Sequence, residues 1–538
     1  MESLHQIEII ILLLTAVLAL TTLAQTLLIP YPILLVIGGL ILGLLPGLPT
    51  IHLNPDLVFL VFLPPILWAA AYFTSLREFR HNIRPISMLA VGLVLATTAA
   101  VAIVAHAALP GMGWAEAIAL GAIVSPPDAV SATAIARRLR IPHRLVTILE
   151  GESLVNDATA LVLYRAAVAT AVSGTFILRD TLLQFVLAGV SGILVGLAVG
   201  AMARLVLRRW TTDSFTEIAV TLLAPYVAWV LAELAHSSAV LACVAGGLYL
   251  RQHFSAEVAP ITRIQGRTVW ELLVFVLNGV IFILIGLQLG ALREAVPAGQ
   301  FATLVVTGVL ISATAIVVRL LWVPLGAIVP RLVSPSLRRR DPIPPWSHVL
   351  IVGWTGMRGI VTLAAALALP VTTTAGTPFP FRAEIILLSF SVILATLVLQ
   401  GLSIAPLIRI LKVKEDRSLE HEEMRAREDA AKAALAHLEK VADGDRAIPD
   451  HLDRLRTHYE QRLQRYAPTG PVDSECTSEA AEAFRQIRHE TLTAERLALI
   501  TLRDDGTISD EVLHRLEHEL DVEALRLGIG ERRATALP

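Results

Sequence analysis

The segment LEGESLVNDATALVLYRAAV, residues 149–168, places acids and an amide within a long apolar run. Glu152 and Asn156 are four residues apart, and so are Ser153 and Asp157. Residues with this spacing share one side of an α-helix, so the segment predicts an apolar helix with one polar side. Polar groups inside a membrane are rare, and they normally face a partner or a water-filled cavity. The alternative for Asp157 is a permanently paired, purely structural acid.

The composition of the whole chain is that of a membrane protein. The chain has 538 residues, of which 55% are hydrophobic and 17% charged, and its mean hydropathy is +0.67. A soluble domain is less apolar and carries more charge. Cys243 lies in an apolar run and Cys476 in a polar one, so the two cysteines predict neither a disulfide nor a metal site.

Apolar runs close to the length needed to cross a bilayer recur from residue 7 to about residue 411. We predict an all-α polytopic protein of about thirteen spans, with a transmembrane domain at 1–411 and a helical cytoplasmic tail at 412–538. The spans are expected near 7–29, 32–46, 56–73, 85–109, 115–137, 146–172, 181–207, 215–235, 238–250, 270–291, 301–323, 347–370 and 384–410. In the tail, EEMRAREDAAKAALAHLEKV (422–441) and ISDEVLHRLEHELDVEALRL (508–527) have helical spacing.

Basic residues concentrate in one set of alternate loops, which predicts that these loops are cytoplasmic. The set contains Arg77, Arg80, Arg84, Arg137, Arg138, Arg140, Arg144, Arg204, Arg208, Arg209, Arg251, Arg263, Arg267, Arg331, Arg338, Arg339 and Arg340. We therefore expect a multi-pass protein of the inner (plasma) membrane, with the N-terminus outside and the tail inside. No basic cluster is interleaved with aromatics, so nucleic acid is not an expected partner.

The fifth span contains SPPDAV, residues 125–130. Consecutive prolines cannot donate backbone hydrogen bonds, so the helix should break between Ser125 and Pro127. A break within the membrane exposes carbonyl oxygens, which are suitable ligands for a hard cation, and Asp128 follows immediately. The alternative is a simple proline kink in which Asp128 caps the second half of the helix.

The twelfth span contains VGWTGMRGIVTL, residues 352–363, whose three glycines predict a second loosened helix. Arg358 lies near mid-depth and needs a carboxylate or freed carbonyls as a partner. A role as an internal counter-ion is as reasonable as a role in transport. Because the two broken spans are seven apart, a repeat that relates them would be inverted. We expect Glu271 and Arg319 to form a structural ion pair near the cytoplasmic side.

Together these motifs resemble the monovalent cation:proton antiporter-1 family, the sodium/proton exchangers, in its bacterial form. The motifs are FLPPIL (62–67), SPPDAV (125–130), GESLVNDA (151–158), GMRG (356–359) and LVLQGLSIAPL (397–407). The resemblance covers residues 7 to about 411. It implies a homodimer, built from a dimerisation domain and a mobile core in which two broken helices cross at the ion site.

The resemblance also implies roles for individual residues. Asp157 would bind both the cation and the proton, beside Ser153, with Asp128 and the carbonyl of Ser125 completing the site. Asn156 occupies the amide position of the family, and Glu152 and Arg358 would form a supporting pair. One departure is Ala69, which follows the proline pair of span three where relatives usually carry an acid. This departure affects the expected affinity for the ion and the choice of ion.

A buried carboxylate that holds either a proton or a cation, combined with alternating access, produces antiport. With a single titrating acid at Asp157, we expect electroneutral exchange of one monovalent cation (Na⁺, with Li⁺ or K⁺ as alternatives) for one H⁺, serving sodium transport and pH regulation. No cofactor is expected, and no nucleotide-binding loop is present. A cation channel is the alternative reading. An enzyme is disfavoured because the chain contains neither HExxH nor GxSxG.

Overall fold

The structure is a computed structural model whose described residues form helices almost throughout. The described residues are 2–27, 30–43, 58–128, 141–174, 178–210, 213–258, 260–295, 301–374, 376–413, 418–442 and 449–466, with parts of 487–523. Within them, the only β-structure is an isolated bridge between Thr372 and Pro378. In this described part of the chain, six helices are each long and apolar enough to cross a membrane, and four shorter ones are also apolar. The predicted all-α membrane fold is confirmed, whereas the count of thirteen spans stays a prediction.

The chain divides into two compact units, Met1–Asp416 and Arg417–Pro538. The second unit contains α20 (Ser418–Ala442) and α21 (Pro449–Tyr466). Helix α20 covers the predicted segment 422–441, whereas most of the predicted segment 508–527 lies outside the described residues.

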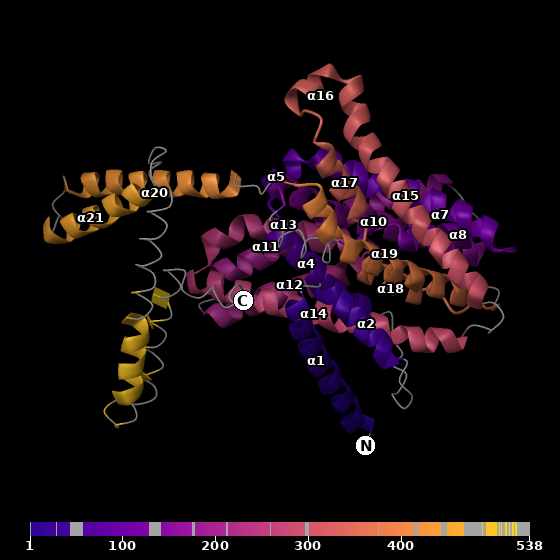
Figure 1. The fold of residues 1–538 in the computed structure, drawn as a ribbon, viewed down its shortest axis with the longest axis horizontal. Helices are drawn as coiled ribbons and strands as arrows, with labels where there is room; N and C mark the ends of the chain where they lie inside the picture. The colour runs from indigo at the N-terminus through magenta and orange to yellow at the C-terminus, as the bar shows by residue number, and fades with distance from the viewer. Residues whose placement is uncertain are drawn as a thin grey trace. The chain divides into compact units, whose positions relative to one another are not determined.

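Within Met1–Asp416, one group of helices packs together as a scaffold (Figure 1). Its members are α1 (Glu2–Leu27), α2 (Tyr31–Gly43), η1 (Val58–Phe62), α4 (Leu63–Phe73), α11 (Leu178–Arg209), α12 (Ser214–Leu234), α13 (Ala239–Glu257) and α14 (Pro260–Ala295). Helix α11 packs along α13, and α2 packs along α14. A Cβ atom on Gly39 would lie 3.1 Å from the Cα of Gly286, so glycines are what allow α2 and α14 to approach so closely.

A second group of helices, which we call the core, carries the predicted site. Its members are α5 (Leu76–His81), α6 (Ile83–Ser87), η2 (Met88–Leu93), α7 (Val94–Ala108), α8 (Trp114–Val124), α10 (His143–Ser173), α15 (Phe301–Val333), α16 (Pro335–Arg340), α17 (Trp346–Trp354), α18 (Ile360–Leu367) and α19 (Arg382–Ile410). Helix α8 packs against α7 and α10, and α15 packs against α19 and α17. Fewer contacts join the core to the scaffold, chiefly from α10 to α13 and α4 and from α14 to α18 and α19.

Both predicted helix breaks fall in the core. Helix α8 ends at Val124, two residues before the first of the two prolines, and residues 125–128 are not helical. The remainder of that predicted span, residues 129–140, lies outside the described residues. Helix α17 ends at Trp354 and α18 begins at Ile360, so GMRG falls within the gap between them. The prolines and glycines therefore interrupt their helices where the sequence predicts.

Candidate functional site

The two broken segments meet through main-chain atoms. The N–H of Asp128, just past the proline pair, donates a hydrogen bond of 2.7 Å to the carbonyl of Met357 in the α17–α18 gap. Gly359 makes this crossing possible, because a Cβ atom there would lie 2.9 Å from the Cβ of Asp128. The Asp128 carboxylate consequently sits against the first residue before α18, at the positive end of that short helix.

A cavity of about 570 Å³, the site cavity, joins this crossing to the polar side of α10. Asp128, Ser153 and Asp157 all line it. The Asp157 side chain is only 6% exposed and lies near the middle of α10. The structure thus brings together three of the four predicted ligand residues around one buried space.

Ser125 is the predicted ligand residue that the site cavity does not include. Its side chain is fully buried, and its hydroxyl donates to the carbonyl of Ala122 at 3.0 Å, within α8. The residues of the break that line the cavity are instead Pro126 and Pro127.

Asn156 ties α10 to the broken segment. Its side-chain amide donates to the carbonyl of Pro127 at 3.1 Å, and the residue is completely buried. Pro127 lies in the non-helical segment 125–128, so the amide satisfies a main-chain acceptor at the break. Asn156 therefore positions the break relative to Asp157, its neighbour on α10.

Two further polar residues line the site cavity and were missed in the sequence. Asn278 of α14 is 1% exposed and Thr362 of α18 is also 1% exposed. Among the described residues, neither Asn278 Oδ1 nor Thr362 Oγ1 has a hydrogen-bond partner. Buried polar atoms rarely stay unpaired, so these oxygens indicate a place for water or a cation. Each residue stands alone in an apolar stretch, and spacing gives no signal for it.

Glu152 pairs with a different arginine from the one predicted. Arg319 of α15, rather than Arg358, contacts Glu152, through a bidentate ion pair with N–O distances of 2.5 and 2.8 Å. Arg319 Nε also donates to the carbonyl of Val352 at 3.1 Å, and both charged side chains are 1% exposed. The expected Glu271–Arg319 pair is therefore wrong as well, because Glu271 pairs with Arg267 at 2.7 Å. Helix α15 continues to Val333, which places Arg319 in its interior rather than at its end.

Arg358 lies in the gap between α17 and α18 and is 1% exposed. Its backbone N–H donates to Thr396 Oγ1 at 3.1 Å. Its guanidinium Nε and Nη1 find no hydrogen-bond acceptor among the described residues. Two arginines and one glutamate thus share the interior of the core, close to the ends of broken helices.

Ala69, at the position where the family resemblance implies an acid, lines the site cavity and is 3% exposed. Arg251, Arg267 and Glu271 line the same cavity, and they belong to the side of the protein with the arginine-rich loops. The site cavity therefore extends from Asp157 toward that side.

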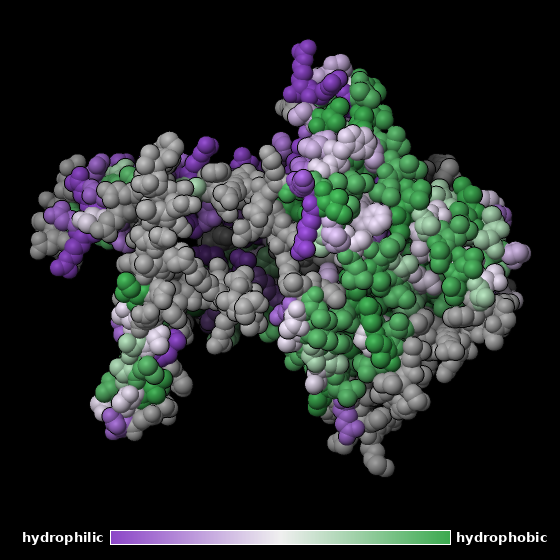
Figure 2. Space-filling model, in the orientation of Figure 1, coloured by the Kyte–Doolittle hydropathy of each residue, from purple (hydrophilic) through white to green (hydrophobic). Residues whose placement is uncertain are grey.

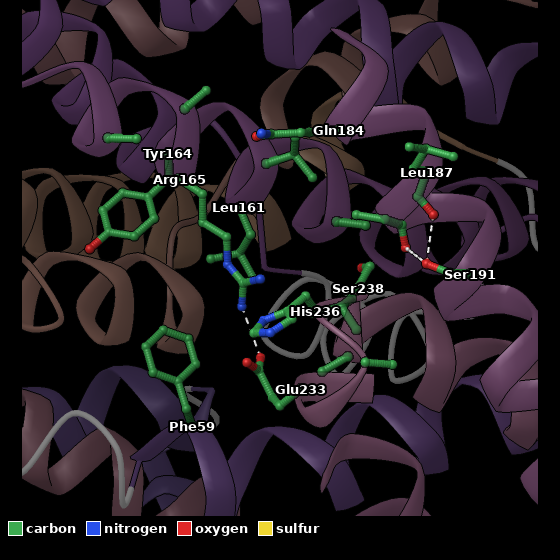
Figure 3. Close-up of a pocket in the computed structure, with 18 of the residues that line it drawn as sticks. Phe59, Leu161, Tyr164, Arg165, Gln184, Leu187, Ser191, Glu233, His236 and Ser238 are labelled. Carbon is green, nitrogen blue, oxygen red and sulfur yellow. Dashed lines mark hydrogen bonds and ion pairs between the residues drawn. The ribbon is translucent and has the colours of Figure 1, made fainter. Parts of the chain in front are cut away.

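A second cavity, of about 1100 Å³, lies toward the opposite side, and we call it the far cavity. It is lined by the second half of α10 together with residues of α11, α12 and α13 (Figure 3). Arg165 of α10 and Glu233 of α12 meet across it at 2.8 Å, beside His236 (Figure 3). None of the described residues lines both cavities. In this conformation Asp157 is thus reached from the arginine-rich side.

The chain matches known proteins over most of its length. Residues 12–410 match the family model described as "Sodium/hydrogen exchanger, transmembrane". An Na⁺/H⁺ exchanger of Mycobacterium tuberculosis, described as uncharacterized, is 36% identical over 535 residues, covering 96% of each chain. A sodium, potassium, lithium and rubidium/H⁺ antiporter of Bacillus pumilus is 33% identical over 73% of this chain and 59% of its own length.

The fold also matches solved structures. The sodium proton antiporter MjNhaP1 of Methanocaldococcus jannaschii, at pH 8, superposes with a TM-score of 0.59 and 20% sequence identity, covering 76% of this chain and 99% of that one. The matched family consists of transporters rather than enzymes, and its antiporter function does not favour the channel reading. With its crossed broken helices and buried acids, this chain is a member of the sodium/hydrogen exchanger family.

Proposed function

We propose that the chain exchanges a monovalent cation for H⁺, with both ions competing for the carboxylate of Asp157. The observation that carries the proposal is the site cavity. It places buried Asp157 beside Asp128 and Ser153 and adds unpartnered oxygens from Asn278 and Thr362. Carboxylate, hydroxyl and amide oxygens are typical ligands of hard cations. When no cation is bound, the buried acid avoids an unpaired charge by binding a proton.

The two cavities support a cycle of alternating access. In the conformation described here, a cation from the arginine-rich side enters the site cavity and displaces the proton of Asp157. Movement of the core relative to the scaffold then opens the site to the far cavity, where the cation leaves and a proton takes its place. The opposing ion gradients drive the cycle, and we propose no cofactor.

We propose Na⁺ as the principal cation, with Li⁺ and K⁺ as the ions to compare. The family model and the relatives support sodium, and one relative is described as exchanging sodium, potassium, lithium and rubidium. Ala69 removes a charge from the wall of the site cavity where relatives usually have one. A site with fewer fixed charges binds cations more weakly, so we expect a lower affinity than in relatives that keep this acid.

Replacing Asp157 by Asn tests the proposal in proteoliposomes that carry a pH-sensitive dye. Asp157→Asn should abolish cation-driven dissipation of the pH gradient, because the amide cannot exchange a proton. The matched control is Glu217→Gln, which alters another buried acid, one held by Thr262 Oγ1 at 2.5 Å in the scaffold. Near wild-type exchange by a folded Asp157→Asn protein would refute the assignment.

We further propose that exchange is electroneutral, with one cation carried for each proton. The Asn156–Asp157 pair supports this, because only one of its two residues is an acid, provided that Asp128 and Glu150, which also line the site cavity, keep one protonation state throughout the cycle. An imposed membrane potential should then drive no net exchange. Currents on a solid-supported membrane that reverse with the cation gradient would contradict the stoichiometry and point to Asp128.

We also propose a homodimer in the inner (plasma) membrane, with the arginine-rich loops and the tail in the cytoplasm. The excess of arginine in alternate loops supports this orientation. Cys476 of the tail is a natural reporter, since Cys243 is fully buried. A membrane-impermeant maleimide should label it only after the cells are permeabilised. Sedimentation in detergent would separate a dimer from a monomer.

A further inference from the structure

A further pair of cavities lies at the arginine-rich end of the core, away from the ion site. Two adjoining cavities, of about 330 and 740 Å³, share Arg84, Met88, Pro330 and Leu337 as lining residues. The smaller one is walled mostly by apolar residues of α10, α15 and α17, including Leu145, Trp322, Val323 and Val349. We call the two cavities together the arginine groove.

The rim of the groove is strongly basic. Arg84 is exposed and lines both cavities, and exposed Arg338 and Arg339, which line neither, follow directly after the lining residue Leu337 on α16. Arg144 and Arg331 also line the smaller cavity. Figure 2 shows hydrophilic residues at the tip formed by α16, directly beyond the hydrophobic surface of α15.

One acid opposes these charges. Asp341 accepts hydrogen bonds from Arg144 at 3.0 Å and from Arg331 at 2.5 Å. Burial acts to raise the pKa of the Asp341 carboxyl, but the hydrogen bonds and charges of Arg144 and Arg331 outweigh it, so the pKa is lowered. The carboxylate is therefore charged at neutral pH. It compensates one arginine, which leaves the groove with a net positive charge.

The walls are apolar and reach the surface of the protein. Val91 lines the larger cavity and is 37% exposed, and Ile343 lines the smaller one and is 39% exposed. Trp322 donates its indole N–H to the carbonyl of Met88 at 3.0 Å, which leaves its ring faces to the apolar wall. An apolar slot with a cationic rim complements an amphiphile with an anionic head.

We propose that the arginine groove binds an anionic phospholipid. Its phosphate lies among Arg84, Arg338 and Arg339, and an acyl chain lies along Met88 and Trp322. Basic pockets between transmembrane helices at the membrane surface are suited to such headgroups, and the volume is that of a small-molecule site. A soluble anion matches the rim alone and leaves the apolar slot unfilled.

The proposal can be tested by native mass spectrometry of the purified full-length protein with phosphatidylglycerol or phosphatidylcholine added. Wild type should retain phosphatidylglycerol in preference to phosphatidylcholine. Arg84→Gln should weaken retention of phosphatidylglycerol about fivefold, since one arginine near an anionic headgroup contributes roughly this factor to the affinity for the lipid. Arg80→Gln is the matched control: Arg80 is exposed and four residues upstream, but it does not line the groove. Equal effects of the two substitutions, or equal retention of the two lipids, would overturn the proposal.

Asp341→Asn gives a test in the opposite direction. Removing the acid frees Arg144 and Arg331, so retention of phosphatidylglycerol should increase. Brominated phosphatidylglycerol supplies a second readout, because it should quench the fluorescence that Trp322→Phe removes. If Arg84→Gln does not fold, Arg338→Gln on exposed α16 replaces it. Unchanged retention in Asp341→Asn, together with no quenching assigned to Trp322, would show that the groove does not hold the lipid. These readouts need no transport and are independent of the assignment of Asp157.

Discussion

Glu152 and Arg319 show at the residue scale how the core tolerates charge in its interior. Both side chains are 1% exposed, and two parallel hydrogen bonds join them. Such a pair offsets the large free energy of taking each charge out of water, but only while both partners are present. Arg358, buried nearby, has no comparable partner among the described residues.

A double-mutant cycle should therefore reveal strong coupling between Glu152 and Arg319. Glu152→Gln or Arg319→Met alone should lower the stability by about 3–5 kcal/mol, because each leaves a buried charge unpaired. The double variant should be more stable than the sum of the two losses implies. Thermal unfolding in detergent measures the coupling, and the Glu152–Arg358 cycle is the control, with the smaller value expected. If both cycles gave no coupling, the bidentate pair would contribute nothing to folding.

Sequence spacing predicted the α10 side of the site because Glu152, Ser153, Asn156 and Asp157 lie within one helix. The partner of Glu152 could not be predicted in this way. Which arginine reaches it depends on where α15 ends relative to α10, and that is a property of helix packing rather than of spacing. Asn278 and Thr362 were missed for the same reason, since the scaffold and the core bring them to the site cavity.

At the scale of secondary-structure elements, the crossing of the two broken segments depends on residues that lack an N–H group or a Cβ atom. Proline removes N–H donors at the end of α8, and Gly359 removes a Cβ atom at the start of α18. Both features were predictable from the sequence, because proline pairs and clustered glycines interrupt helices for local reasons. Which carbonyl accepts the N–H of Asp128 was not predictable, because it joins residues far apart in the chain.

Gly359→Ala should weaken cation binding without unfolding the core. The added methyl group would meet the Asp128 carboxylate and its Cβ, at 2.9 Å from the latter, so Asp128 must move. Overpacking of this kind costs about 1–3 kcal/mol, which would correspond to a rise in KM for the cation of about fivefold to 150-fold. Gly266→Ala on α14 is the control, since its new methyl group would be 3.6 Å from Ile218 Cγ1. Identical KM values for the two variants would show that Asp128 tolerates the displacement.

At the scale of the whole membrane unit, the Arg165–Glu233 pair links the two helix groups. It joins α10 of the core to α12 of the scaffold across the far cavity (Figure 3). Its side chains are 56% and 45% exposed, so water screens the interaction and its strength is modest. A modest interaction between groups that move relative to each other can nevertheless bias the balance between two conformations.

Breaking this pair should shift the population toward a conformation open to the far cavity. An exposed ion pair contributes about 0.2–1 kcal/mol, so Glu233→Gln should change the population ratio by up to about fivefold. Spin labels at Ala169 of α10 and Leu234 of α12, on a background without native cysteines, would report the change as a longer distance distribution. The charge swap Arg165→Glu with Glu233→Arg should restore the original distribution. If Glu233→Gln and wild type gave superimposable distance distributions, the ion pair would not affect the balance between the two conformations.

The hydrogen bond from the N–H of Asp128 to the carbonyl of Met357 has a consequence for how such proteins diverge. Because both atoms belong to the main chain, most substitutions of the surrounding side chains leave the bond in place. The exceptions are proline at position 128, which has no N–H, and a side chain at position 359, which would displace Asp128. Mutation can therefore exchange acids, amides and hydroxyls around the crossing while the frame that aligns them persists. Ala69, at the position where the family resemblance implies an acid, illustrates such an exchange. The backbone arrangement can therefore be inherited unchanged while the side chains that determine ion preference vary.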